Sequence, residues 1–349
     1  MIRKLLLLLA VGLLLAVLAL AVAAWRLHVA LEQPLQLSAE RLIEVVPGDT
    51  PSGVLNRLQT DGVLDGALWL RLYWRFNLPG QPLHSGEYRL TPQLTARDVL
   101  GLWQRGEVVQ YSLTLVEGWN FRQVRIALAR QEALQQNLPA LDDKALMAAL
   151  GEPDASPEGR FFPDTYRYVR GMTDLELLKA AKLRLDQILD QEWQQRAADL
   201  PYSKPYDALI MASMVERETG VPEERGQIAG VFVRRLRIGM RLQTDPTVIF
   251  GLGDSYKGNL TRSHLLMPSP YNTYLINGMP PTPIALAGRE AIHAALHPVD
   301  GKSLYFVARG DGSHVFSDSL DAHNRAVREF QLKRRSDYRS SPKPDKEKP

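Results

Sequence analysis

The sequence contains no cysteine. This absence excludes disulfide bonds, cysteine-ligated zinc and thiol nucleophiles, and it permits an oxidising compartment without requiring one. Two familiar catalytic signatures are also missing. The glycine-rich segment 251–258 has neither the G-x-G-x-x-G nor the G-K-[ST] pattern, and Ser213 lacks a G-x-S-x-G setting. Dinucleotide binding, P-loop chemistry and a serine hydrolase therefore have little support.

The sequence has little excess charge before its C-terminus. The formal net charge is +3, and residues 333–349 alone hold seven Lys or Arg and three Asp or Glu. These residues thus contribute +4, and the rest of the chain contributes −1. A nearly neutral body gives no reason to expect a groove for nucleic acid, so no nucleic-acid partner is predicted. The C-terminal segment is predicted to be a disordered basic tail.

One long hydrophobic run is present, and it lies at the N-terminus. Leu5 to Ala24 contains no charged residue and is about as long as a helix that crosses a bilayer. Arg3 and Lys4 precede it, which favours a cytoplasmic N-terminus and a body on the other side of the membrane. The alternative is a cleaved signal peptide, because residues 21–23 have the A-x-A form. We predict a retained anchor, since the apolar region of a signal peptide is usually shorter.

Two strand, turn and helix units are predicted after the anchor. In the first, a β-branched run meets a turn at 47–49, and Thr50 or Ser52 is placed to cap the helix after the turn. In the second, Thr95 caps a helix that ends at Gly106. The first unit resembles the opening of LysM-type glycan-binding modules, in which a strand ends at a P-G-D-T turn and a helix comes next. The same residues also make an ordinary turn with a helix cap.

The middle of the chain is predicted to be mostly helical. Between residues 120 and 200, three segments carry apolar residues at three and four spacing, which is typical of packed helices. The aromatic segment "EGRFFPDTYRY", residues 158–168, is too irregular for a helix face. It is predicted to be a buried loop that packs two subdomains together.

The C-terminal third is predicted to alternate helices with extended loops. One helix covers Asp207–Thr219 and is ended by Gly220 as a left-handed cap. A second covers Pro222–Ile238 and is ended in the same way by Gly239. A β-hairpin and a closing helix are predicted at residues 303–317 and 320–333.

The helix before Gly220 carries two glutamates with different predicted surroundings. Its apolar stripe is formed by four residues: Ile210, Met211, Met214 and Val215. Glu218 is the next position on this stripe, whereas Glu216 lies about 200° round the axis. A carboxyl held against apolar groups has a raised pKa and can donate a proton, so Glu218 is a candidate general acid. Alternatively, both glutamates are exposed in the last turn of a surface helix, although acids there oppose the helix dipole.

Polar groups suited to sugars occur in two segments closer to the C-terminus. "RLQTDP" and "SPYNTY" supply amides, hydroxyls and rings that hydrogen-bond N-acetyl groups or stack on pyranose faces. Taken singly, each is an ordinary turn former. The candidate supporting residues are Gln243, Thr244, Asp245, Tyr271, Asn272 and Tyr274. His293 and His297 have i, i+4 spacing but lack the H-E-x-x-H glutamate, so no metal site is predicted.

Six segments carry a resemblance to a known family. They are "LVEGW" at 115, "EGRFFPDTYRY" at 158, "ASMVERETG" at 212, "VFVRRLRIGMRLQTDPTVIFGLG" at 231, "SPYNTYLINGMPPTPIA" at 269 and "LYFVARGDGSHVFS" at 304. In order and spacing they resemble the endolytic murein transglycosylases of the MltG (YceG-like) family. The likeness spans nearly everything between the apolar run and the basic tail. Met214 stands where relatives often have isoleucine, a volume-conserving change.

The resemblance implies a bacterial inner-membrane protein with one span, a cytoplasmic N-terminus and a periplasmic body. It implies internal cleavage of nascent peptidoglycan glycan strands, a role in terminating glycan elongation, and no cofactor. It also implies that the second glutamate of E-x-E, Glu218, is catalytic. Glu218 would protonate the glycosidic oxygen between N-acetylmuramic acid and N-acetylglucosamine. It would then take the proton of the muramoyl C6 hydroxyl, which closes on C1 to give a 1,6-anhydro end.

Candidates to support Glu218 and the substrate N-acetyl group are Glu216, Gln243, Asp245 and Asn272. The expected partners are peptidoglycan glycan strands and the inner membrane, with peptidoglycan synthases as further candidates. Two other functions stay open: a muramidase-type hydrolase that uses Asp245 with Glu218, and a non-catalytic, membrane-anchored glycan-binding scaffold.

The predicted fold class is α+β, with an N-terminal transmembrane helix, a LysM-like βα subdomain and a mixed α+β catalytic domain. The predicted segments are a cytoplasmic N-terminus at 1–4, a transmembrane helix at 5–25, a connector at 26–37, a LysM-like subdomain at 38–108, a helical scaffold at 109–200, a catalytic core at 201–332 and a basic tail at 333–349.

Overall fold

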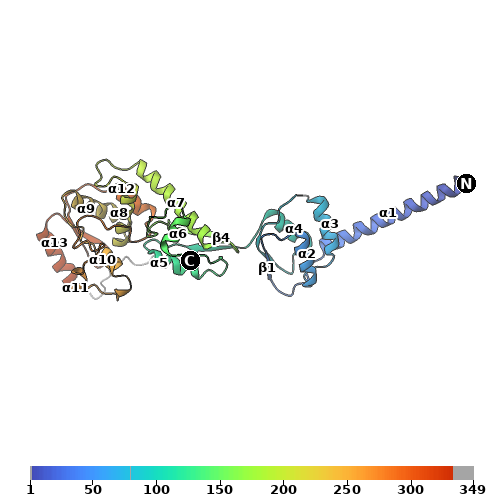
Figure 1. Cartoon of the computed structure of the whole chain (residues 1–349), viewed down its shortest axis with the longest axis horizontal. Coiled ribbons are helices and arrows are strands. Elements are labelled where there is room, and N and C mark those ends of the chain that lie inside the picture. Colours follow the sequence, from blue (N-terminus) through green and yellow to red (C-terminus); the bar gives the residue numbers. More distant parts are fainter. Residues whose placement is uncertain (1, 79, 333–349) are drawn as a thin grey trace. The chain divides into compact units, whose positions relative to one another are not determined.

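The computed structural model describes residues 2–78 and 80–332, which form two compact units. The first unit contains the chain up to Tyr111 together with Ala133–Gln135 and Arg167–Met172. The second contains most of the chain after Tyr111, and each unit has its own hydrophobic core. The predicted basic tail, 333–349, lies outside the described residues. The course of the chain can be followed in Figure 1.

The fold is α+β, as predicted, because short sheets are set among many helices. The described residues contain three two-stranded sheets, which pair β1 with β2, β3 with β4, and β5 with β6. The elements of the first half are α1 (Ile2–Glu32), β1 (Arg41–Val45), α2 (Pro51–Thr60), α3 (Ala67–Asn77), β2 (Gly86–Leu90), α4 (Ala96–Arg105), β3 (Gln110–Thr114), α5 (Phe121–Ala129), α6 (Asp143–Ala149), β4 (Thr165–Val169) and α7 (Asp174–Gln194). Those of the second half are α8 (Pro205–Glu218), α9 (Arg225–Arg237), α10 (Asp245–Leu252), α11 (Arg262–Leu265), α12 (Arg289–Leu296), β5 (Tyr305–Ala308), β6 (His314–Ser317) and α13 (Leu320–Val327). The finer division of the chain at residues 108 and 200 stays a prediction.

The N-terminal helix is longer than the sequence indicated. α1 is one helix of 31 residues, and its most apolar 18-residue window is not buried anywhere in the described protein, as expected for a membrane span. It does not end near Trp25 but continues through most of the predicted connector. No proline or glycine occurs between Trp25 and Pro34, and Ala30 and Leu31 are buried in the core of the first unit. Burial of these two residues holds the end of α1 in helical form.

Helix caps in the first unit form as predicted. The side chain of Thr50 accepts the N–H of Gly53 and begins α2. Thr95 and Asp98 form a capping box at the start of α4, which ends at Gly106 in the left-handed region. β1 and β2 pair in antiparallel register. The core of this unit includes the fully buried ring of Trp103, which makes edge contacts with the rings of Trp74 and Tyr88.

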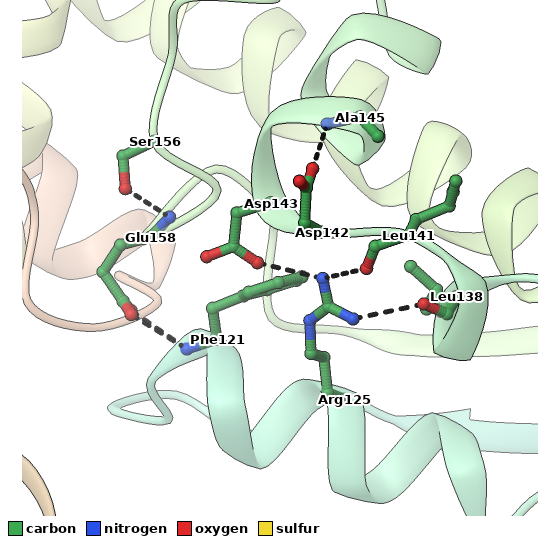
Figure 2. Close-up of polar contacts among 9 residues, drawn as sticks. All are labelled: Phe121, Arg125, Leu138, Leu141, Asp142, Asp143, Ala145, Ser156 and Glu158. Atoms are coloured by element: carbon green, nitrogen blue, oxygen red, sulfur yellow. Dashed lines mark hydrogen bonds and ion pairs between the residues drawn. The ribbon is translucent and has the colours of Figure 1, made fainter.

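The first half of the aromatic segment, residues 158–163, is a buried or half-buried loop, as predicted, and it connects two helices of the second unit. The second half is not a buried loop, because it forms strand β4 and residues 164, 165 and 167 are exposed. Both carboxyl oxygens of Glu158 accept the N–H of Phe121, at 3.1 Å, at the first turn of α5 (Figure 2). The rings of Phe121 and Phe161 stack, and the N–H of Phe162 donates to the carbonyl of Ala181 on α7. Burial raises the pKa of Glu158 to about 7.

Figure 2 also shows how α5 is tied to the segment after it. The Arg125 guanidinium donates to the carbonyls of Leu138 and Leu141, at 3.3 and 3.1 Å, and to the Asp143 carboxylate at 2.9 Å. Asp142 accepts the N–H of Ala145 and caps α6. The loop and the two short helices therefore form one connected support.

α8 lies at the centre of the second unit. It is buried on every side from Ala208 to Val215, and it packs against α7, α9, α10 and α12. Apolar residues round the whole circumference explain why its sequence shows only a weak single stripe. The predicted hairpin and closing helix are confirmed as β5, β6 and α13.

The predicted left-handed cap at Gly220 is wrong. α8 ends at Glu218, and Thr219 comes next in an extended conformation with φ −139° and ψ 139°. The Thr219 hydroxyl accepts the N–H of Val221 at 2.9 Å and donates to the Glu224 carboxylate at 3.4 Å. Glu224 in turn accepts the backbone N–H and contacts the ring Nδ1 of His314 on β6. A threonine with a buried hydroxyl partner thus ends the helix, and no left-handed residue is required. At the end of α9, by contrast, Gly239 has φ 70°, as predicted.

Replacement of Gly230 on α9 by alanine is expected to destabilise the second unit. An added Cβ would lie 2.3 Å from the carbonyl oxygen of Val299, a backbone atom that cannot move aside. Overpacking of this kind costs about 1–3 kcal/mol, more than the roughly 1 kcal/mol that alanine gains in a helix. Hydrogen exchange of α9 peptides should therefore show faster opening in Gly230→Ala.

The matched control is Gly101→Ala on α4, where the nearest atom to an added Cβ is the flexible guanidinium of Arg105. This variant should slow exchange in α4. Since no fixed atom is in the way, the higher helix propensity of alanine makes the substitution stabilising. Protection of α9 in Gly230→Ala equal to that of the unmodified protein would contradict the packing argument.

Candidate active site

The two glutamates of α8 lie in different surroundings, although both are half-buried. The hydroxyl of Thr244 donates a hydrogen bond to Oε1 of Glu218. Burial raises the pKa of Glu218 to about 7. The Thr244 hydrogen bond acts against this rise in pKa, and the nearby negative charge of Asp245 adds to it. A carboxyl that is neither permanently charged nor permanently neutral near pH 7 is suited to move protons.

Glu216 instead binds the start of another helix. Its Oε2 accepts the N–H of Gly288, at 3.0 Å, where α12 begins. Burial raises the pKa of Glu216, and the carboxylate of Glu117 adds to the rise. Because α8 is buried all round, the two glutamates cannot be distinguished by burial alone. They differ in their hydrogen-bond partners: Glu216 accepts a backbone N–H at the start of α12, whereas Glu218 accepts the side-chain hydroxyl of Thr244.

A buried threonine that the sequence analysis did not select holds the Thr244 loop in place. The hydroxyl of Thr273 accepts the N–H of Thr244 at 3.0 Å, and the carbonyl of Thr273 accepts the N–H of Gln243 at 3.1 Å. Thr247 adds a hydroxyl contact to Thr273 at 2.8 Å. Gln243 has φ 51°, a left-handed conformation uncommon for a residue with a side chain. The two predicted polar segments, 241–246 and 269–274, are therefore joined through Thr273.

Four of the six predicted loop residues lie around Glu218 or close to its partner Thr244. Thr244 contacts it directly. Asp245 comes after Thr244 as the first residue of α10, and its Oδ1 accepts the hydroxyl of Tyr274 at 2.7 Å. Burial, Asp245 and Glu218 together raise the pKa of Tyr274, so this phenol stays protonated. Gln243 is exposed, and its side-chain amide makes no hydrogen bond to any other residue that the structure describes.

The other two predicted residues shape the loop. The amide of Asn272 donates to the carbonyls of Leu265 and Met267, at 3.1 and 2.8 Å, and its oxygen accepts the N–H of Tyr274. All the polar capacity of this buried side chain except one lone pair is used. The Tyr271 hydroxyl pairs with Thr282 at 2.9 Å, and its ring packs edge-on against Phe250. Neither side chain is directed to Glu218 by these contacts.

Arg235 is a charged member of the neighbourhood that the sequence analysis missed. It is buried on α9, where its guanidinium donates to the carbonyls of Leu242 and Leu304, at 2.8 and 2.6 Å, and lies over the ring of Tyr305. Its positive charge acts to lower the pKa of Glu218. A sequence signal existed, because Arg235 continues the buried face of Ile228 and Phe232 at helical spacing.

The two histidines of α12 approach a carboxylate. Ligand atoms of Glu192, His293 and His297 all lie within 4.8 Å of one another. Glu192 is already engaged, since it contacts the guanidinium of Arg289 at 2.6 Å and Nδ1 of His293 at 2.9 Å. An arginine on the carboxylate opposes the binding of a cation there, so these contacts explain the cluster as a structural ion pair.

Comparisons with known proteins agree on one family. The YceG-like family matches residues 43–329 of this chain. An endolytic murein transglycosylase of Bacillus subtilis is 28% identical over 305 residues, which cover 82% of this chain and 84% of the relative. One of Streptococcus pneumoniae is 24% identical over 332 residues, which cover 85% of this chain and 60% of the relative.

A solved structure points the same way. The crystal structure of a YceG-like protein from Listeria monocytogenes aligns with a TM-score of 0.50 and 28% sequence identity, over 82% of this chain and 98% of that one. The family match begins in β1 and ends after α13, and it includes every segment on which the resemblance was based. The chain belongs to the YceG-like family.

Proposed function

We propose that this protein is an endolytic murein transglycosylase, in which Glu218 cleaves the bond between N-acetylmuramic acid and N-acetylglucosamine without water. The observation that carries the proposal is the Glu218 carboxyl, which has a pKa of about 7 and lies at the end of a buried helix, where it accepts a hydrogen bond from the Thr244 hydroxyl. Burial raises the pKa of Glu158 to a similar value, but both of its oxygens accept the N–H of Phe121. The relatives of Bacillus and Streptococcus are named for this activity, which supports the reaction class.

The proposed reaction uses the two protonation states of Glu218 in turn. With a pKa near 7, about half of the carboxyl groups are neutral at neutral pH and able to donate. The neutral form gives its proton to the glycosidic oxygen as the bond to the muramoyl C1 breaks. The carboxylate then removes the proton of the C6 hydroxyl, whose oxygen bonds to C1. Glu218 is regenerated, and the product carries a 1,6-anhydro end.

The loop residues suit supporting roles in this reaction. Thr244 donates to Glu218 and so stabilises the carboxylate between the two proton transfers. The Asp245 carboxylate, held by Tyr274, supplies negative charge beside the positive charge that develops at C1. The exposed amide of Gln243 is available to the N-acetyl group of the substrate. Glu216 and Asn272 support the site through the backbone that they hold.

The first unit is proposed to position glycan without cleaving it. Its order of strand, turn and helix supports the prediction of a LysM-like module, which stays a prediction. Its buried carboxylate, Glu87, is paired with the Arg170 guanidinium at 2.6 Å and with the Tyr111 hydroxyl, so its negative charge is compensated. Glu87 is therefore engaged in structural contacts within this unit.

Glu218→Gln is expected to abolish the formation of anhydromuramoyl ends in digests of purified sacculi. Glutamine keeps the size and the hydrogen bond to Thr244 but cannot give or take the proton. Loss of a general acid and base costs about 10² to 10⁴ in rate, and more where no second group replaces it. Chromatography of the digest separates the possible reactions: anhydro ends indicate a transglycosylase, reducing ends a hydrolase that uses Asp245, and no soluble product a glycan-binding scaffold.

Glu216→Gln is the matched control, because it changes the same chemical group two residues away and should slow the reaction less. The fold of Glu218→Gln should be at least as stable as the original above pH 7. Since the pKa of Glu218 is raised from 4.5 to about 7, its favourable contribution is present at low pH and is lost as pH rises through 7. Full activity in Glu218→Gln with an inactive Glu216→Gln would reverse the assignment.

Activity should fall as pH rises past about 7, and Thr244→Val should move this fall to higher pH. The first step needs neutral Glu218, whose pKa is about 7, and the Thr244 hydroxyl stabilises its charged form. Valine removes the hydroxyl at nearly constant volume, so the pKa of Glu218 should rise. The release of anhydro ends is measured against pH for both proteins and for Thr244→Ser, which keeps the hydroxyl and should keep the original profile. If the pH dependence of anhydro-end release is the same in Thr244→Val as in the original protein, the proposed effect of Thr244 on the pKa of Glu218 is wrong.

The N-terminal helix is compatible with a single-pass membrane anchor, and we propose that it spans the inner membrane with the body in the periplasm. Alkaline phosphatase fused after residue 349 should then be active, because that enzyme folds only in an oxidising compartment. The same enzyme fused at Arg26 provides a matched reporter on the outer side of the span. A shortened soluble product from the full-length gene would instead show cleavage at the A-x-A pattern.

A further inference from the structure

α3 exposes a stripe of large apolar side chains that nothing in the described protein covers. Leu68, Leu72 and Phe76 are 53%, 38% and 71% exposed. They occur at i, i+4 and i+8, so they lie within about 80° of the helix circumference. Scattered single apolar residues are normal on a protein surface, but a row of three along one helix face marks an interaction site.

The opposite face of the same helix is also apolar, and it is buried. The residues that α3 buries in the core of the first unit are Ala67, Leu70 and Trp74. The folding of this unit therefore already accounts for one face of α3, and the exposed stripe is in excess of what the core needs. A helix that is apolar on both faces has a second apolar neighbour.

The end of the membrane helix lies beside the start of α3. Gly66, which precedes α3, packs against Ala30 of α1 so closely that an added Cβ would meet the Ala30 Cβ at 2.9 Å. Ala30 is six residues beyond Ala24, the last residue of the uncharged run, or about 9 Å along a helix. That distance is comparable to the thickness of the headgroup layer. Figure 1 shows α3 on the side of its unit from which α1 extends.

The side chains that border the stripe are those of a membrane interface. Trp69 and Tyr73 line one edge and are partly buried, whereas Arg71 and Arg75 line the other edge. α3 contains no acidic residue, and no described residue forms an ion pair with either arginine. Tryptophan and tyrosine favour the headgroup level, and arginine is attracted to anionic lipid phosphates.

We propose that α3 lies on the periplasmic surface of the bilayer, with Leu68, Leu72 and Phe76 in the boundary between headgroups and acyl chains. The first unit is then held to the membrane at two places, through α1 and through α3. An interfacial helix of this kind buries its apolar face about 5–10 Å deep. The inference rests on the proposed membrane placement of α1, and it is independent of the catalytic role of Glu218.

The test uses the full-length protein in vesicles of phosphatidylethanolamine and phosphatidylglycerol. Because the chain has no cysteine, single cysteines at Leu72→Cys and Phe76→Cys can each be labelled with an environment-sensitive fluorophore. Both positions are exposed, so the labels replace no core contact. We expect blue-shifted emission, strong quenching by lipids that carry a doxyl group near the headgroup, and loss of quenching by aqueous iodide.

Two matched positions control the measurement. Leu42→Cys on β1 replaces a leucine that is 44% exposed, and Figure 1 shows β1 on the side of the unit away from α1. Its label should be quenched by iodide and not by lipid. Leu13→Cys, inside α1, should be quenched only by lipid. A label at 13 that lipid does not quench would overturn the placement of α1 and the inference with it.

Two further outcomes would overturn the proposal. If iodide quenches the labels at 72 and 76 as strongly as the label at 42, the apolar stripe of α3 is exposed to water and does not contact lipid. Labels shielded from both quenchers, and exposed to iodide when the protein is diluted among more vesicles, would show that a second copy of the chain covers α3. Release of anhydro ends by the same labelled proteins checks the proposed catalytic function separately.

Discussion

The burial of one carboxyl at the end of a fully enclosed helix is the constraint on which the site depends. α8 has no solvent face between Ala208 and Val215, so its last turn is fixed by the packing of four other helices. The backbone that carries Glu218 is therefore held in one place, although the side chain is only half-buried. Its environment, and not its chemical nature, raises its pKa to about 7. The loop with Thr244 and the buried Thr273 then set how far the pKa rises.

This arrangement separates two tasks between two similar residues. Burial raises the pKa of both Glu216 and Glu218, yet Glu216 accepts the N–H of Gly288 at the start of α12. A carboxylate at a helix N-terminus is stabilised by the helix dipole and by the N–H it accepts. Glu218 instead accepts the side-chain hydroxyl of Thr244, and the negative charge of Asp245 lies nearby. In the proposed reaction, the pattern E-x-E thus combines one acid that holds a helix start with one acid that exchanges its proton.

Local features of this fold could be predicted from the sequence, and features that depend on distant contacts could not. The Thr95 cap of α4 and the hairpin of β5 and β6 are set by residues close in the chain, and both were predicted correctly. α3 was not predicted, because apolar residues on two faces hide the helical period. Gly220 was misassigned as a cap, since the hydroxyl partner of Thr219 is supplied by Glu224, which β6 holds in place. In the site, the helical stripe selected Glu218, but the link through Thr273 and the buried charge of Arg235 required the tertiary structure.

The continuous helix of α1 has a mechanical consequence for the first unit. α1 stays helical to Glu32, and Ala30 and Leu31 near its end are buried in the core of the first unit. No flexible segment therefore separates the apolar part of α1 from this unit. A tether of coil would let the unit sample a wide shell of positions, whereas a continuous helix fixes its distance from the lipid. Any tilt or spin of the anchor is then passed directly to the module above it. If α1 spans the membrane as proposed, the lipid bilayer is the reference that fixes the height of this unit above it.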